Sequence, residues 1–190
     1  MPVDPTRVNE YGDLVLRELA EFVALADPAR LALFDSVRRS GPISTADLAA
    51  AVGAAPREVA DDLVRLEEAG LIDRTDERWT SDVQGTYFEI PDEEELQRAA
   101  RRLSSVMLAS YAGLPGEWVE HDEPSLSVEW ARAAGLFNAR VAITEAELRG
   151  VQDELERVLA PFTTRTEADT PADAAEVRVL AFFMPRARVD

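Results

Sequence analysis

Cysteine and lysine are absent from this 190-residue sequence, and histidine occurs once, at His121. Without cysteine the chain has no disulfide, no thiolate metal ligand and no cysteine nucleophile. The lone histidine lies between Glu120 and Asp122, and a single histidine in such a charged loop is more often solvated than functional. We therefore expect no metal site and no redox chemistry.

Long apolar runs are also missing. No stretch approaches the roughly 20 apolar residues that a membrane-spanning helix needs. The first residues, MPVDPTRVNEYGD, lack the basic and apolar regions of a signal peptide. These features predict a cytoplasmic protein with no membrane partner.

Catalytic signatures are lacking as well. The sequence contains no Gly-x-Ser-x-Gly, no phosphate-binding loop and no dinucleotide fingerprint. We expect no catalytic residues, no cofactor and no enzyme activity. An enzyme built around the aromatic C-terminal half is the weakest of the alternatives.

The composition is that of an acidic globular protein. Hydrophobic residues make up 46% and charged residues 30% of the chain, and the formal net charge is -17. The length allows two small domains, each able to bury a core. Residues 1–91 hold nine arginines against eighteen acidic residues. This balance bears on partners, because nucleic-acid binding normally draws on clustered basic residues that displace counterions.

Apolar periodicity, caps and breaks predict a winged helix-turn-helix domain over residues 13–91. Asp27 and Pro28 form a helix start. Strand-like residues 71–72 and 86–90 flank a polar, turn-rich stretch at 73–85, the pattern of a β-hairpin wing. The predicted helices cover residues 14–26, 28–39, 44–53 and 56–70.

Residues 92–115 are predicted to form a linking or dimerisation helix, since acidic residues fill its first turn and an apolar stripe follows. Beyond it, residues 116–190 predict a small β-β-α-β unit for dimerisation or ligand sensing. Its strands are placed at 126–130, 137–143 and 177–184, and its helix opens with the capping box Thr144-Glu145-Ala146-Glu147. The fold class is therefore α+β.

Three motifs carry a family resemblance: Ala26-Asp27-Pro28-Ala29-Arg30-Leu31-Ala32-Leu33-Phe34, Thr45-Ala46-Asp47-Leu48-Ala49, and Leu63-Val64-Arg65-Leu66-Glu67-Glu68-Ala69-Gly70-Leu71-Ile72. In this order they resemble the ArsR-like winged helix-turn-helix transcriptional regulators. The C-terminal half is similar to the actinobacterial type, through Trp118, the segment 144–148 and the segment 177–180. The resemblance implies a homodimer that binds double-stranded DNA in transcription regulation and answers to a small-molecule effector.

The resemblance makes the helix from Pro56 to Ala69 the reader of the major groove. The sequence departs from the family there, because Ala60, Asp61 and Asp62 stand where polar or basic residues usually face DNA. The candidate DNA-binding residues are Ser44, Thr45, Arg57, Asp61, Arg65, Arg74, Arg78 and Thr80. One alternative for each of these arginines is that it pairs with a neighbouring acidic residue on the solvated surface. The alternative for the whole domain is a winged-helix scaffold that has lost DNA binding and binds a protein or a small molecule.

The C-terminal half holds most of the aromatic residues. With few polar groups between them, these residues are candidates for a small-molecule pocket. The alternative is that they form the core of the unit or its dimer interface. The candidate pocket residues are Trp118, Trp130, Phe137, Arg140 and Phe182.

Overall fold

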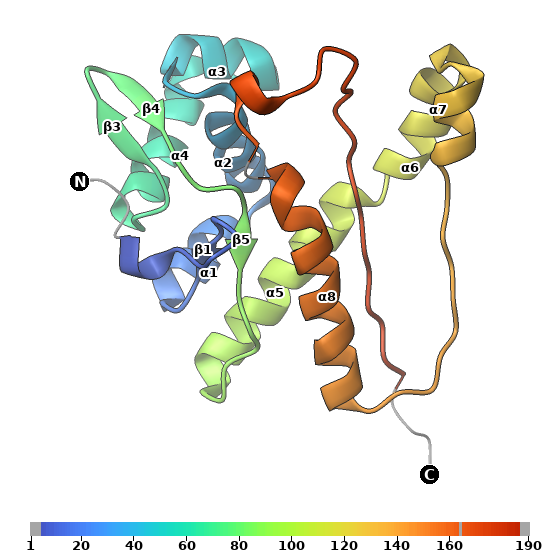
Figure 1. Cartoon of the computed structure of the whole chain (residues 1–190). Helices are drawn as coiled ribbons and strands as arrows, with labels where there is room; N and C mark the ends of the chain where they lie inside the picture. The colour runs from blue at the N-terminus through green and yellow to red at the C-terminus, as the bar shows by residue number, and fades with distance from the viewer. Residues whose placement is uncertain (1–4, 164, 187–190) are drawn as a thin grey trace.

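A computed structural model describes residues 5–163 and 165–186 as a set of helices with a few short strands, an α+β protein at this level of description (Figure 1). The helices are α1 (Leu19–Leu25), α2 (Pro28–Ser40), α3 (Thr45–Val52), α4 (Pro56–Glu68), α5 (Glu94–Tyr111), α6 (Leu114–Glu117), α7 (Val128–Ala133) and α8 (Glu145–Thr163). The strands are β1 (Leu14–Val15), β2 (Ile43–Ser44), β3 (Asp73–Thr75), β4 (Arg78–Thr80) and β5 (Thr86–Tyr87). Short helical turns cover Pro5–Arg7, Trp118–Asp122, Glu123–Ser125 and Glu167–Asp169.

Local capping explains where α2 and α3 begin. The Asp27 carboxylate accepts hydrogen bonds from the backbone N–H groups of Ala29 (3.0 Å) and Arg30 (3.1 Å), and Pro28 takes the first helical position. The Ser44 hydroxyl accepts from the backbone N–H of Asp47 at 3.2 Å. Both predicted helix starts are confirmed. They could be predicted from the sequence because a helix cap depends only on residues a few positions away.

The core is built by α1 to α5 and the hairpin. Phe22, Phe34 and Leu63 are almost completely inaccessible to solvent, and Trp79 of the hairpin is buried among them. Every buried residue of the described chain lies between Leu14 and Leu103. Burial of this apolar surface is the main force that holds these elements together.

Two small sheets complete this part of the molecule. Strands β2, β4 and β3 form an antiparallel sheet in that order, and β1 pairs in parallel with β5. The predicted wing strands were therefore wrong in detail. Residues 71–72 precede the hairpin, the hairpin occupies 73–80, and β5 joins β1 because Leu14 and Leu16 donate backbone hydrogen bonds to Gly85 and Tyr87.

The first predicted helix also begins later than expected, at Leu19 instead of residue 14. Its start is set by Glu21, a buried carboxylate that accepts hydrogen bonds from the backbone N–H groups of Arg17 (2.6 Å) and Glu18 (2.8 Å). Arg7 forms an ion pair with the same carboxylate. Glu21 thus joins the N-terminal segment to α1.

The predicted C-terminal β-β-α-β unit of residues 116–190 is corrected: among the described residues 116–163 and 165–186, its helix forms and its strands do not. Residues 128–133 are the helix α7, because the Ser127 hydroxyl caps it by accepting from the backbone N–H of Trp130 at 3.3 Å. Residues 137–143 and 177–184 have no hydrogen-bonded partner strand among the described residues. A segment forms a β-strand only when its backbone is hydrogen-bonded to a neighbouring strand.

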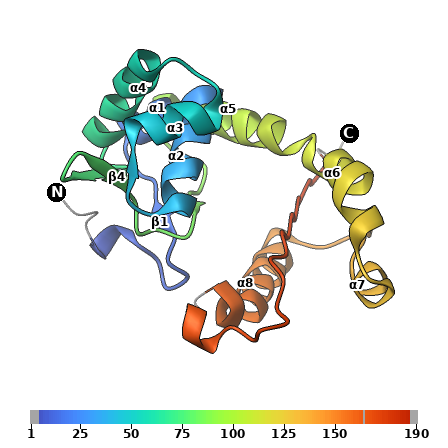
Figure 2. The same ribbon diagram turned by 90° about the horizontal axis from the view of Figure 1, so that it is seen from above.

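The predicted helix at Thr144 is confirmed as α8. The Glu147 carboxylate accepts from the backbone N–H of Thr144 (2.7 Å) and from its hydroxyl (2.8 Å), and these hydrogen bonds lower the pKa of Glu147. Figure 2 shows α5 running out from α1–α4, with α6 and α7 at its far end and α8 standing apart from the N-terminal helices. An ion pair between Arg149 and Glu89, 3.2 Å long, links α8 to the residues after β5.

None of the helices in the described part of the chain is both long enough and apolar enough to cross a membrane.

Replacement of Glu21 by alanine should lower the free energy of unfolding by about 2–4 kcal/mol, because two backbone N–H groups and Arg7 lose the carboxylate that accepts their hydrogen bonds. Urea unfolding followed by circular dichroism measures this loss. The matched control is Glu58→Ala, an exposed carboxylate in the first turn of α4. Equal stability of the two variants would contradict the structural role of Glu21.

Candidate nucleic-acid interface

The α3 and α4 helices are joined by a tight turn that fixes their relative direction. Gly53 ends α3 in the left-handed conformation (φ 65°), and Pro56 opens α4. Val59, Leu63 and Leu66 form the buried face of α4, which contacts α1, α2 and α3. The opposite face of α4 is therefore presented to solvent.

This outward face carries both signs of charge. Arg57, Asp61 and Arg65 follow one another at four-residue spacing along it, with Val64 (41% exposed) beside them. The whole helix contains two arginines and five acidic residues. Its charge alone therefore does not favour phosphate binding.

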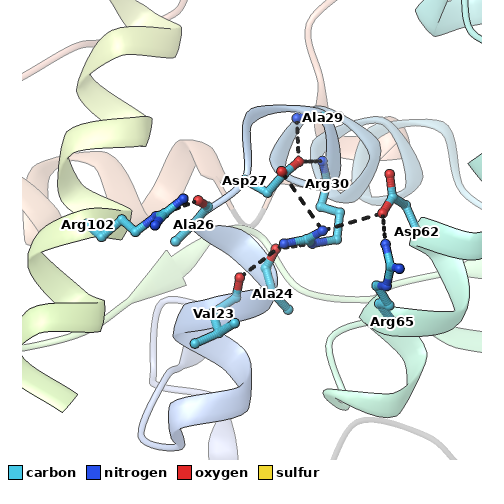
Figure 3. Close-up of polar contacts among 9 residues, drawn as sticks. All are labelled: Val23, Ala24, Ala26, Asp27, Ala29, Arg30, Asp62, Arg65 and Arg102. Carbon is cyan, nitrogen blue, oxygen red and sulfur yellow. Dashed lines mark hydrogen bonds and ion pairs between the residues drawn. The ribbon is translucent and has the colours of Figure 1, made fainter. Parts of the chain in front are cut away.

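One of the two adjacent aspartates in α4 is turned away from this face. Asp62 accepts hydrogen bonds from the guanidinium groups of Arg30 (3.4 Å) and Arg65 (3.0 Å), and its side chain is only 20% exposed (Figure 3). Asp61 is exposed and makes no ion pair within the described residues. Of the two carboxylates that the sequence places side by side in this helix, only Asp61 therefore lies on the exposed face.

Arg30 is the centre of this cluster. Its Nε donates to the carbonyl oxygen of Ala24 at 2.6 Å, and a terminal nitrogen donates to that of Val23 at 3.2 Å. These carbonyls lie at the C-terminal end of α1, where cations are favoured by the helix dipole. Through Asp62 the same guanidinium connects α1 and α2 to α4 (Figure 3). Sequence reasoning missed this role, although Arg30 stands in the first family-like motif.

The hairpin β3–β4 is anchored on α3 by Trp79. The indole N–H of this buried residue donates to the hydroxyl of Thr45 at 2.9 Å, and β4 pairs with β2 just before α3. The Arg74 guanidinium lies 5.2 Å from the centre of the Trp79 ring, a cation–π contact. The hairpin is thus held against the start of α3.

Two of the three hydroxyl groups proposed to bind DNA already have intramolecular partners. The Ser44 hydroxyl bonds with Asp47, the Thr45 hydroxyl accepts from Trp79, and Thr80 is half-buried in β4. The Ser44 and Thr45 hydroxyls are therefore already used within the fold, and Thr80 is partly covered. Sequence spacing could not distinguish a cap from a phosphate contact, because both use the same residue types.

The four proposed arginines are exposed. Arg65 pairs with Asp62, whereas Arg57, Arg74 and Arg78 form no ion pair within the described residues. Arg78 donates instead to the carbonyl oxygen of Pro42 at 3.1 Å. The alternative in which every arginine is neutralised by a neighbouring acid therefore holds for Arg65 alone.

The tip of the hairpin is acidic. Asp76 (φ 48°) and Glu77 (φ 63°) form its two-residue turn, both in the left-handed region that such turns require. Their side chains are exposed at the end of the hairpin. Phosphate contacts from the hairpin would therefore come from Arg74 and Arg78 on the strands.

The proposed small-molecule pocket in the C-terminal half does not form a closed site. Phe137 is 90% exposed, Phe182 is 43% exposed and Trp130 is 39% exposed. Arg140 is exposed as well, and Trp118 is half-buried next to α6. Side chains this accessible cannot enclose a ligand.

The Asp62 cluster predicts different effects for the two adjacent aspartates. Asp62→Asn should lower the free energy of unfolding by about 1–2 kcal/mol, because Arg30 and Arg65 lose their shared carboxylate. Asp61→Asn should change it by less than about 0.5 kcal/mol, as usual for an exposed side chain. Urea denaturation of both variants measures the difference, and equal destabilisation would contradict the assignment.

Comparison with known proteins places a similarity on this same part of the chain. No curated protein matches the sequence. The family model HVO_A0114 matches residues 25–90, which run from the end of α1 past β5. This is less than half of the 190 residues. The chain is therefore similar to the HVO_A0114 family over the segment that holds α2–α4 and the hairpin.

Proposed function

We propose that this chain is a DNA-binding transcriptional regulator of the ArsR-like type, in which residues 13–91 form a winged helix-turn-helix. The observation that supports it best is the pairing of two exposed elements: the outer face of α4 and the hairpin β3–β4, held on α3 by the hydrogen bond between Trp79 and Thr45. A helix presented across a turn fits the major groove, and the hairpin would reach the adjacent phosphates.

The charge pattern supports a binder with modest phosphate affinity. Arg57 at the start of α4 and Arg78 on β4 would contact phosphates, while Arg65 is partly neutralised by Asp62. Asp61 would face the bases, where a carboxylate can accept a hydrogen bond from cytosine N4. The neutralisation of Asp62 by Arg30 removes one of the two negative charges that the sequence places near DNA.

Binding to DNA fragments that flank the gene of this protein, measured by fluorescence anisotropy as salt is lowered, tests the proposal. We expect a specific complex whose affinity falls as salt rises. Arg57→Ala should weaken it about tenfold and reduce the salt dependence by about one counterion. Asp61→Asn should strengthen binding to non-specific DNA about fivefold, because a charge that repels phosphate is removed.

The matched control is Arg98→Ala, which removes an exposed arginine of α5 that pairs with Glu94. It should leave DNA affinity unchanged. Absence of any complex at low salt, with the protein folded, would overturn the proposal.

A second function is favoured by the acidic surface. Asp61 on α4 and Asp76 and Glu77 at the hairpin tip are exposed carboxylates at the places where a DNA-binding domain meets phosphates. They support a winged-helix scaffold that has lost DNA binding and instead binds a protein or a small molecule. The same anisotropy experiment separates the two functions, because a scaffold gives no salt-sensitive complex.

We also propose that the regulator is a homodimer joined through α5 and the C-terminal region. Of the twenty large apolar residues that are exposed in the described chain, sixteen lie at or after Leu108. Exposed apolar surface on this scale is typical of interaction surfaces. A two-fold dimer would bring two copies of α4 to successive half-sites on DNA.

Light scattering of the full chain should give about twice the monomer mass of 20.9 kDa. Leu108→Asp, at a residue of α5 that is 50% exposed, should shift the protein toward the monomer, because a charge is placed in the interface. Val64→Asp, a matched change on the outer face of α4, should leave the mass unchanged. A monomeric wild-type chain at micromolar concentration would contradict the dimer.

A further inference from the structure

Two extended segments of the C-terminal region leave their backbone unpaired. Residues 137–143 lead into α8, and residues 177–184 follow the helical turn Glu167–Asp169 (Figure 1). Neither segment forms a backbone–backbone hydrogen bond with another described residue. Their N–H and C=O groups are therefore available to a neighbouring strand, which would bind them as a β-ladder.

The two segments differ in how their side chains alternate. Successive residues of a strand point to opposite faces of its sheet. In 177–184 both alternating sets are apolar apart from Arg178, whereas 137–143 has one apolar set and one that contains Asn138 and Arg140. A strand with two apolar faces fits the centre of a sheet, and a strand with a charged face fits its edge.

The apolar side chains of these segments are not covered within the described chain. Every valine, isoleucine, phenylalanine and methionine of the two segments is exposed. The helix between them adds a further apolar surface, because Val151, Val158 and Phe162 lie on one side of α8 and are exposed as well. Removal of this surface from water by another chain would be favourable.

Charge favours a second copy of this chain as the partner. The formal net charge is -17, so two copies repel each other in general. Residues 130–143 and 177–186, however, hold four arginines and no acidic residue, whereas α8 carries five acidic residues and two arginines. The extended segments of one copy would therefore be attracted to α8 of the other.

Symmetry favours the same partner. A two-fold axis perpendicular to a sheet aligns the same segment of two chains in antiparallel directions, so that the contacts of one chain are repeated by the other. Each copy then donates and accepts equivalent ladder hydrogen bonds. An extended segment that is apolar on both faces is suited to such pairing with itself.

We propose that residues 137–143 and 177–184 become strands of one β-sheet shared by two copies of this chain. The two copies of 177–184 pair in antiparallel directions about the two-fold axis at its centre, and 137–143 adds at each edge. The exposed apolar side of each α8 packs on the sheet. The shared sheet rests on the homodimer of the proposed function and gives its C-terminal region a defined structure.

Cysteine scanning tests the pairing, since the wild-type chain has no cysteine. In an antiparallel pair, the two copies of a residue separate by about 7 Å for each step from the axis, because a strand rises about 3.4 Å per residue. A disulfide needs Cα atoms within about 7 Å of each other. Of the single variants from Val177→Cys to Met184→Cys, we expect one near Leu180 to form a cross-linked dimer in high yield, and those at both ends to form little.

The control for this scan is Asp82→Cys, at an exposed residue outside the C-terminal region, which should not cross-link. Equal yields along the whole segment would indicate a parallel or non-specific contact. That result, or absence of a cross-link at every position, overturns the proposal.

Proline substitution tests the ladder itself. Ala181→Pro removes an N–H from the proposed central strand in each copy and should raise the dimer dissociation constant at least about tenfold. Ala181→Val keeps the N–H and should leave the constant unchanged. Analytical ultracentrifugation measures both, and circular dichroism should show the same helix content as the wild type. An unchanged dissociation constant in the proline variant overturns the proposal.

Amide exchange separates this inference from the proposed function. Residues 177–184 of the wild-type dimer should exchange hydrogen for deuterium at least about tenfold more slowly than in Ala181→Pro. A dimer with neither protection nor cross-links overturns the shared sheet alone. A wild-type monomer overturns the sheet together with the homodimer, and protected amides in that monomer would show pairing within one chain. A cross-linked dimer that binds no DNA overturns the regulator and leaves the sheet standing.

Discussion

The Arg30 guanidinium sets the geometry of the N-terminal unit. It donates hydrogen bonds to two carbonyl oxygens at the end of α1 and forms an ion pair with Asp62 of α4. Because Arg30 itself belongs to α2, this one side chain connects α1, α2 and α4. Because Arg30 is only 16% exposed, water competes weakly for these contacts. Together with the buried face of α4, formed by Val59, Leu63 and Leu66, these contacts hold α4 against α1 and α2.

Charge placement then decides how the α4 face can be used. An acidic protein can bind DNA only where local arginines outweigh nearby carboxylates. Here Asp62 is directed toward α2, and Asp61 remains among Arg57, Val64 and Arg65 on the exposed face. The hairpin repeats this arrangement, with arginines on its strands and carboxylates at its tip. In the proposed DNA complex, such a surface would favour selective contacts over strong non-specific attraction.

The C-terminal part of the chain lacks the buried core that holds the N-terminal unit together, since no described residue after Leu103 is buried. The α8 helix is amphipathic, yet none of its residues is buried. The extended segments 137–143 and 177–184 show apolar side chains and backbone groups without partner strands in the described residues. Elements of this kind gain stability when apolar surface and strand edges are covered by another chain. This is why assembly, more than folding of the single chain, is expected to organise this region.

The sequence alone determined the features that depend on neighbouring residues. The starts of α2, α3 and α8 followed from Asp27, Ser44 and Thr144, because a cap needs only residues a few positions away. Tertiary structure decided the rest of the site. That Asp62 pairs with Arg30, that Trp79 is buried against Thr45, and that β5 joins β1 are contacts between residues far apart in the chain. Periodicity and spacing describe one element at a time, whereas these contacts exist only after the elements have packed together.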